Sequence, residues 1–231
     1  MTDWLISEVP GDIEGALLDD QALGALTQSR GEPATPEPPL AVSINDIVIH
    51  DTRKWFGGAA IRLDVLVVHG NAAGTGADGW YTPTTRVFPD VRDGQRLNAE
   101  GMLLFLGWPR HFLDLFIIAS RDTKDAEGLG DLLRDRLAGD DTQGAVGHLA
   151  ALVAAPEAMV VAAAAKAALT VGSLAYDVVR TVTSKSVGVY QRSWLEHADA
   201  FGLGRHPAGA GERIRAEDFS FWLNVRRDVA T

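Results

Sequence analysis

The sequence contains no cysteine in its 231 residues. Disulfide bonds, thiolate metal sites and cysteine nucleophiles are therefore excluded. The first fifteen residues, MTDWLISEVPGDIEG, also lack the basic start and the continuous apolar core of a secretory signal. From these two absences we expect a cytoplasmic protein.

Positive charge is also scarce, since the formal net charge is −10. Residues 1–39 hold eight acids and one base, whereas residues 40–231 hold 23 acids and 20 bases. Most of the acidity therefore belongs to the first segment. Sequence-independent binding of nucleic acid needs a basic surface, so nucleic acid is not an expected partner.

Proline is concentrated in SRGEPATPEPP, residues 29–39, where four of eleven residues are proline. Such a stretch is typical of an extended linker. We therefore divide the chain into an acidic N-terminal segment (1–28), a proline-rich linker (29–39) and a folded domain (40–231).

The domain has seven runs with the composition and alternation of β-strands. They read LAVSINDIVIHD, IRLDVLVVHG, TTRVFPD (which Pro89 is expected to end), GMLLFLGW, FLDLFIIASRD, SVGVYQRSWLEH and DFSFWLNVRR. No helical pattern separates the first five, which favours an antiparallel β-sandwich over a parallel sheet. Most tryptophans in or beside these runs are expected to be core, among them Trp108, Trp194 and Trp222.

A helical insertion of two to three helices is predicted at about residues 126–184, which makes the fold class α+β and mainly β. AEGLGDLLRDRL and TQGAVGHLAALVAA are its first two helices, and a third opens near Pro156. The third helix has a regular polar stripe that includes Lys166, so a permanent transmembrane span is disfavoured. Its broad apolar side is either buried in the domain or a latent membrane or self-association surface. That surface would consist of Val160, Val161, Leu169, Val171, Leu174 and Val178.

No complete catalytic motif is present. GTGADG is followed by WYTPTT, which does not open a helix, so it is not a dinucleotide-binding loop. No serine lies in a G-x-S-x-G elbow. His50, Asp51 and His69 end neighbouring predicted strands and, if they converge, could hold a metal for a hydrolase. His111 and Asp114 form a second candidate pair of a base and its orienting acid.

Aspartates follow the fifth predicted strand, where SRDTKDAEGLGDL carries Asp122 and Asp125 ahead of Leu129 and Gly130. A strand that leads into an acidic loop and an L-G step resembles a C2 domain. The resemblance implies a β-sandwich that brings calcium and lipid headgroups together. Because calcium prefers six to eight oxygen ligands, Asp122 and Asp125 would need Asp78, or else Asp90 and Asp93, to lie close to them. The D-P-Y step common in C2 domains is missing, and a large helical insertion is not usual for them.

A glycine-rich basic loop, GLGRHPAGAGERIR, lies between the last two predicted strands. With neighbouring residues it forms a candidate basic patch for anionic headgroups or for the acidic N-terminal segment. The patch consists of Arg192, Arg205, Arg213, Arg215, Arg226 and Arg227.

The function that these patterns favour is a non-enzymatic binding or effector module, with the acidic N-terminal segment as a regulatory cover. The expected partners are a protein, a second copy of the chain, or a lipid membrane to which the protein binds peripherally on activation. No cofactor is required, and calcium is a candidate ion for the C2-like loop. The alternatives are a scaffold subunit of a protein complex and a metal-dependent hydrolase.

Overall fold

The computed structural model describes residues 37–69, 81–110, 112–121, 128–137, 177 and 185–228. The chain divides into two units, Met1–Glu37 and Pro38–Thr231, and the described fold is that of the second. The predicted acidic segment, the calcium loop and most of the helical insertion lie outside the described residues.

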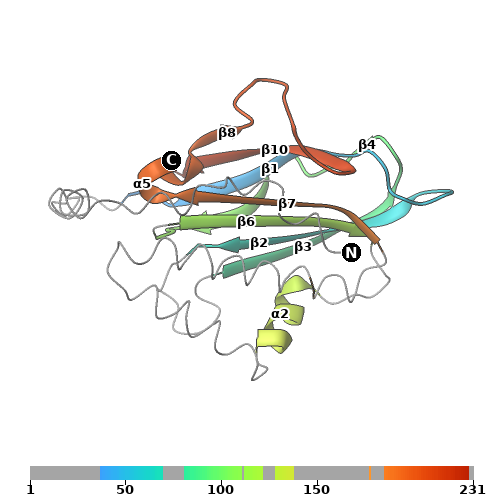
Figure 1. Ribbon diagram of the computed structural model, residues 1–231, viewed down its shortest axis with the longest axis horizontal. Helices are drawn as coiled ribbons and strands as arrows, with labels where there is room; N and C mark the ends of the chain where they lie inside the picture. The colour runs from blue at the N-terminus through green and yellow to red at the C-terminus, as the bar shows by residue number, and fades with distance from the viewer. Residues whose placement is uncertain are drawn as a thin grey trace, which may run out of the picture. The chain divides into compact units, whose positions relative to one another are not determined.

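The second unit is built from two antiparallel sheets (Figure 1). Sheet A has the strand order β4-β1-β10-β8, with β5 also paired to β1 and β9 to β10, and sheet B has the order β3-β2-β6-β7. The strands of sheet A are β1 (Leu40–Ile49), β4 (Gln95–Arg96), β5 (Met102–Gly107), β8 (Gly204–His206), β9 (Ile214–Ala216) and β10 (Phe219–Arg227). Those of sheet B are β2 (Ala59–Val68), β3 (Tyr81–Val91), β6 (Phe112–Arg121) and β7 (Lys185–Leu195). The prediction of a mainly β, antiparallel two-sheet architecture is confirmed.

Only short helical elements accompany the sheets in the described residues. They are α2 (Leu129–Leu137), α5 (Glu196–Asp199) and the 3-10 turn η2 (Ala200–Gly202). The first of them matches the first predicted helix, AEGLGDLLRDRL, and Figure 1 shows it on the side of sheet B that faces away from sheet A. The second and third predicted helices are not covered by the described residues, apart from Asp177, which is helical.

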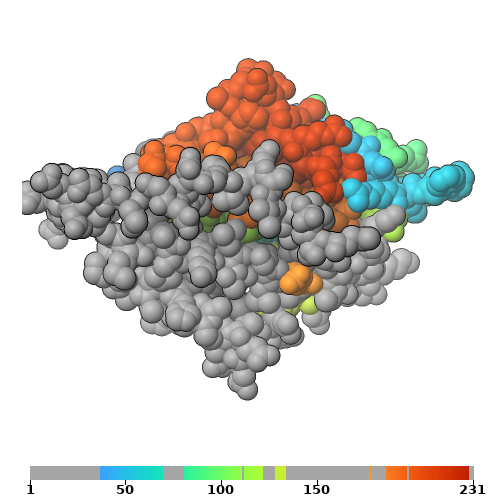
Figure 2. Space-filling model, viewed as in Figure 1, coloured from blue at the N-terminus to red at the C-terminus, as the bar shows by residue number. Residues whose placement is uncertain are grey.

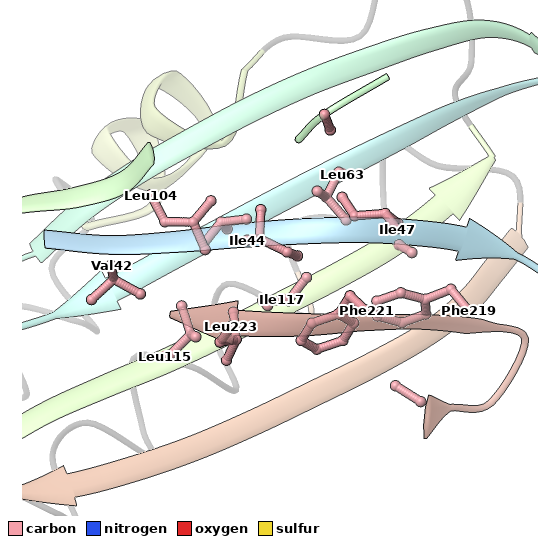
Figure 3. Packing of buried hydrophobic residues seen from close by; sticks show 14 of the residues in the cluster. Val42, Ile44, Ile47, Leu63, Leu104, Leu115, Ile117, Phe219, Phe221 and Leu223 are labelled. Carbon is pink, nitrogen blue, oxygen red and sulfur yellow. The ribbon is translucent and has the colours of Figure 1, made fainter. Parts of the chain in front are cut away.

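The core lies between the two sheets (Figure 3). The alternate residues Ile61, Leu63, Val65 and Val67 of β2 point into it and are fully buried. Phe219 and Phe221 of β10 stack with ring centroids 5.3 Å apart. The apolar alternation in the sequence is therefore the pattern that fills this core.

The alternation of β1 changes phase at a β-bulge. Val42 and Ile44 point into the core, and the next inward residues are Ile47 and Ile49. The pairing with β10 shifts its register between Asn45 and Val48, and Asp46 there has a φ of 53°. One extra residue at the bulge flips the side chains that follow, so both halves of the strand still face the core.

The third strand is longer than predicted. Pro89 does not end it, because β3 continues to Val91. The pairing with β2 shifts its register between Phe88 and Val91, and Asp90 has a φ of 51°. A proline has no amide hydrogen to donate, and the irregularity places it where the ladder is already interrupted.

Sheet B is buried on both faces of its central strands. Arg62 and Asp64, which point away from the core, have no exposed surface. They form an ion pair, with Arg62 Nε 2.6 Å from Asp64 Oδ2 and Nη2 2.9 Å from Oδ1. Thr85 Oγ1 donates to Asp64 at 2.7 Å and accepts from the amide of Leu129 at 2.8 Å. This chain of polar contacts connects β2 and β3 to the start of α2.

Candidate functional site

The loop between β1 and β2, residues 50–58, carries the two most exposed large apolar side chains among the described residues. Trp55 is 88% exposed and Phe56 is 79% exposed. Their rings meet edge to face with centroids 6.1 Å apart. Figure 2 shows the loop as a cyan projection from the body of the protein. We call Trp55 and Phe56 the aromatic tip.

The first half of the loop is fixed to its neighbours by backbone and side-chain hydrogen bonds. The amide of His50 donates to the carbonyl of Asp218 at 2.6 Å. The amide and the hydroxyl of Thr52 both donate to Asp93 Oδ1, at 2.7 and 2.8 Å. These two hydrogen bonds lower the pKa of Asp93, because they favour its ionised form. The base of the loop is therefore held on two sides.

Arg53 ties the loop to the turn between β9 and β10. Its Nε lies 2.6 Å from Asp218 Oδ2 and its Nη2 lies 2.9 Å from Glu217 Oε2. Its backbone carbonyl accepts a hydrogen bond from Arg121 Nη1 at 3.0 Å. The contact with Asp218 is the main reason why the pKa of Arg53 is raised. Arg53 has a φ of 53°, which places the chain in the left-handed region just before the tip.

Two glycines bring the chain back from the aromatic tip to β2. Gly57 has a φ of 73°, a conformation that a side chain disfavours. A Cβ on Gly58 would lie 2.8 Å from the backbone carbonyl carbon of Asp90 and closer still to its carboxylate. The sequence WFGG therefore places two large side chains outward and lets the backbone pass close to β3.

The two basic side chains that precede the tip, Arg53 and Lys54, both have partners within the protein. Arg53 contacts two carboxylates, and the amine of Lys54 donates to the carbonyl of Gly58. The tip is therefore an apolar projection with one lysine at its base.

The residues of the predicted hydrolase site do not come together. His50 follows β1 and donates or accepts a hydrogen bond with Ser220 Oγ at 2.9 Å. His69 follows the far end of β2, whose ten residues separate the two histidines by roughly 30 Å. Within the described ranges, no group of three His, Asp or Glu side chains is arranged to hold a metal ion.

Two buried titratable groups lie at the end of sheet B opposite the aromatic tip. Burial lowers the pKa of His69 to about 4, and its ring packs on Phe105 with centroids 4.9 Å apart. Burial also raises the pKa of Asp114 to about 7, although Ser193 donates a hydrogen bond to it. His111, the predicted partner of Asp114, lies outside the described residues.

The predicted basic patch is largely engaged in contacts within the fold. Arg205 donates to the carbonyls of Pro207, Gly209 and Glu212 and lies over the ring of Trp222, 4.7 Å from its centroid. Three more of its members also have acceptors in the protein. They are Arg213 with Asp46, Arg215 with the Glu217 carbonyl and Arg227 with the Pro38 carbonyl. Arg192 and Arg226 are exposed on two different sheets.

The other predicted sites lie outside the described residues. These are the candidate calcium ligands Asp78, Asp122 and Asp125 and the apolar helical surface from Val160 to Val178. Arg121, the last described residue before the predicted calcium loop, is at the same end of the sandwich as the aromatic tip. In the part of the chain that is described, no helix is long and apolar enough to cross a membrane.

The aromatic tip is not predicted by the sequence pattern, because residues 51–58 do not alternate and indicate only a connection between two strands. A signal was present, since Trp-Phe between Arg-Lys and Gly-Gly is an unusual composition for a link between two strands. Of the tryptophans expected in the core, Trp194 is buried, but Trp108 is 55% exposed at the end of β5.

Comparisons with family models, with curated proteins and with solved structures gave no significant match.

Proposed function

We propose that this protein is a non-enzymatic binding module that docks onto a membrane surface through the aromatic tip. The observation that carries the proposal is the exposure of Trp55 and Phe56, at 88% and 79%, on a loop whose base is held by hydrogen bonds and ion pairs. Neither ring contributes to the core, so folding does not explain why these side chains are aromatic.

The shape and chemistry of the tip favour a lipid surface. Tryptophan partitions to the boundary between lipid headgroups and acyl chains, where one side of the ring is wet and the other apolar. A projecting tip can enter that boundary without any rearrangement of the sandwich. A lysine just behind the rings is compatible with the headgroup layer.

The remaining sequence predictions extend this proposal. We propose that residues 1–28 act as a regulatory cover and that the helical insertion adds a second apolar surface. The C2-like resemblance also belongs to the proposal. In that case Asp122 and Asp125, which follow β6 in the sequence, would be calcium ligands.

A scaffold subunit is the second candidate, and a different surface favours it. Leu103 and Leu106 of β5 are 47% and 51% exposed, on the outer face of sheet A. Trp108, directly after β5, is also exposed, and several exposed apolar side chains on one strand favour a protein contact there. A metal-dependent hydrolase has less support, because its residues lie apart.

The test is vesicle co-sedimentation of the full chain, with and without calcium. The matched pair of variants is W55A/F56A, which removes the tip, and L103A/L106A, which removes exposed apolar side chains elsewhere. Our proposal expects loss of vesicle binding only in W55A/F56A. The opposite pattern, or equal binding by all three proteins, would reject the tip as the docking surface.

A second arm uses residues 38–231. This start keeps Pro38 and Pro39, whose carbonyls accept hydrogen bonds from Arg227 and Asp228. Tighter binding of the shortened chain than of the full chain is expected if residues 1–28 act as a cover. Equal binding would remove the cover from the proposal and leave the tip in place.

A further inference from the structure

The aromatic tip is preceded by two basic residues, Arg53 and Lys54, and the simplest expectation from sequence is that both bind anionic lipid. The structure gives Arg53 a different environment. Its guanidinium contacts Asp218 at 2.6 Å and Glu217 at 2.9 Å, so one positive charge faces two negative charges. A cation already paired in this way has little attraction left for a phosphate or carboxylate headgroup.

The contacts of Arg53 also fix the loop mechanically. Its side chain reaches the β9–β10 turn, and its carbonyl accepts a hydrogen bond from Arg121 at the end of β6. Its backbone amide donates a hydrogen bond to Asp51 Oδ1 at 2.6 Å. Arg53, two residues before Trp55, is therefore connected to both sheets, since β9 and β10 belong to sheet A and β6 to sheet B.

Among the described residues, the side chains that hydrogen-bond to the loop base show no excess of positive charge. The side chains that contact the loop base include the carboxylates of Asp51, Asp93, Glu217 and Asp218, and the cations of Arg53 and Arg121. Lys54 is the one further cation within the loop itself. Long-range attraction to an anionic membrane would need a net positive surface at this end.

We infer that Arg53 is a positioning residue that holds the aromatic tip outward, and that the tip inserts into uncharged phospholipid headgroups as readily as into anionic ones. This inference rests on the proposed function, because it names the kind of lipid surface and the residue that presents the tip. Binding then depends on the exposed rings and on a loop that is already in its docking conformation. Pre-organisation of this kind raises affinity by reducing the ordering cost on binding.

The experiment measures binding of the full chain to vesicles of phosphatidylcholine alone and to vesicles that also contain phosphatidylserine, at low and high salt. The wild-type affinity is expected to change by no more than about twofold between the two lipid compositions and across the salt range. R53Q is expected to lower the affinity about five- to tenfold for both compositions, because the tip is no longer held. K54Q is the matched control with the neighbouring charge removed, and about a twofold change or less is expected.

A charge-reversed pair distinguishes positioning from a general loss of structure. R53D alone should bind weakly, and R53D/D218R should recover part of the affinity, because the pair is restored with its charges exchanged. Quenching of Trp55 fluorescence by brominated lipid, measured against W55F as background, should fall in R53Q and return in the reversed pair.

Three results would overturn the inference. The first is that R53Q binds vesicles with the affinity of the wild type. The second is that R53Q loses affinity only for vesicles that contain phosphatidylserine, which would make Arg53 a direct lipid contact. The third is a failure of R53D/D218R to recover binding while its thermal unfolding matches the wild type. If W55A/F56A binds normally, the proposed function itself fails, so the two failures are distinguishable.

Discussion

Removal of the Asp64 carboxylate is the sharpest test of how sheet B is built. Asp64 and Arg62 are both fully buried, and the guanidinium uses Nε and Nη2 to bind the carboxylate. Asp64→Ala would leave a buried cation with no counter-charge, and Thr85 would lose the acceptor of its hydroxyl. Breaking a buried pair by removal of one partner typically costs about 3–5 kcal/mol. This is a large share of the roughly 5–15 kcal/mol by which most domains are stable.

The assay is equilibrium unfolding in urea. With a denaturant dependence of about 2 kcal/mol per molar, the midpoint should fall by roughly 1.5–2.5 M. Replacement of both partners by apolar residues, as in R62M/D64L, is the matched control, and it should be neutral or stabilising by up to about 4 kcal/mol. Thr85→Val, which removes the link to Leu129, should cost about 1–3 kcal/mol.

A cost below about 1 kcal/mol for Asp64→Ala would refute this reasoning, because a loss that small is typical of a pair exposed to water. The outer face of sheet B would then be open to solvent. A destabilised R62M/D64L variant would show instead that the pair contributes specific geometry that apolar side chains cannot replace.

Asp114 and His69 should give the free energy of unfolding two opposite dependences on pH. Because its pKa is raised, Asp114 stabilises the native state most below about pH 4, and this stabilisation is lost as the pH rises through about 7. Asp114→Asn should therefore stabilise the protein by up to about 4 kcal/mol at about pH 8 and have little effect at about pH 4. The lowered pKa of His69 makes the native state less stable as the pH falls from about 6.5 to about 4. Asp114→Asn removes the opposite effect of Asp114, so urea unfolding of this variant should show a free energy of unfolding that decreases over that pH range. A pH profile unchanged by the substitution would contradict the burial of Asp114. Gly188→Ala should lower the free energy of unfolding by about 1–3 kcal/mol, since the new Cβ would lie 2.3 Å from the carbonyl oxygen of Ala216, and an unchanged urea midpoint would mean that β7 and β9 are not in contact.

All seven long strands could be located from the sequence, because each is an apolar or alternating run bounded by glycine, proline or polar residues, and in β1 and β2 the alternation is imposed by the core. The three short strands β4, β8 and β9 could not. Each has two or three residues, too few for a period, and each is a strand only because a distant partner pairs with it. The end of β3 was misplaced because a proline usually stops a ladder, whereas here it lies at a bulge whose position depends on β2.

The candidate site was much harder to predict than the fold. Sequence reasoning weighted charge, so it selected arginines such as Arg205 and Arg213, which the fold uses for internal contacts. It grouped His50 with His69 because both end strands, but the direction of β2 carries them apart. Exposure depends on what packs against a side chain, so a Trp-Phe pair looked like any other apolar pair until its surroundings were known.

The pairing of β1 with β10 has a consequence for synthesis on the ribosome. Leu40 lies opposite Arg227, so the first long strand of the domain finds its main partner only after almost the whole chain has been made. Until then β1 has an open hydrogen-bonding edge next to apolar side chains, which is the state in which strands pair with the wrong neighbour. Closure of so long a loop is also slow compared with local hairpin formation. Sheet B, whose strands β2, β3 and β6 follow one another closely, can therefore assemble first and serve as the surface on which sheet A is completed.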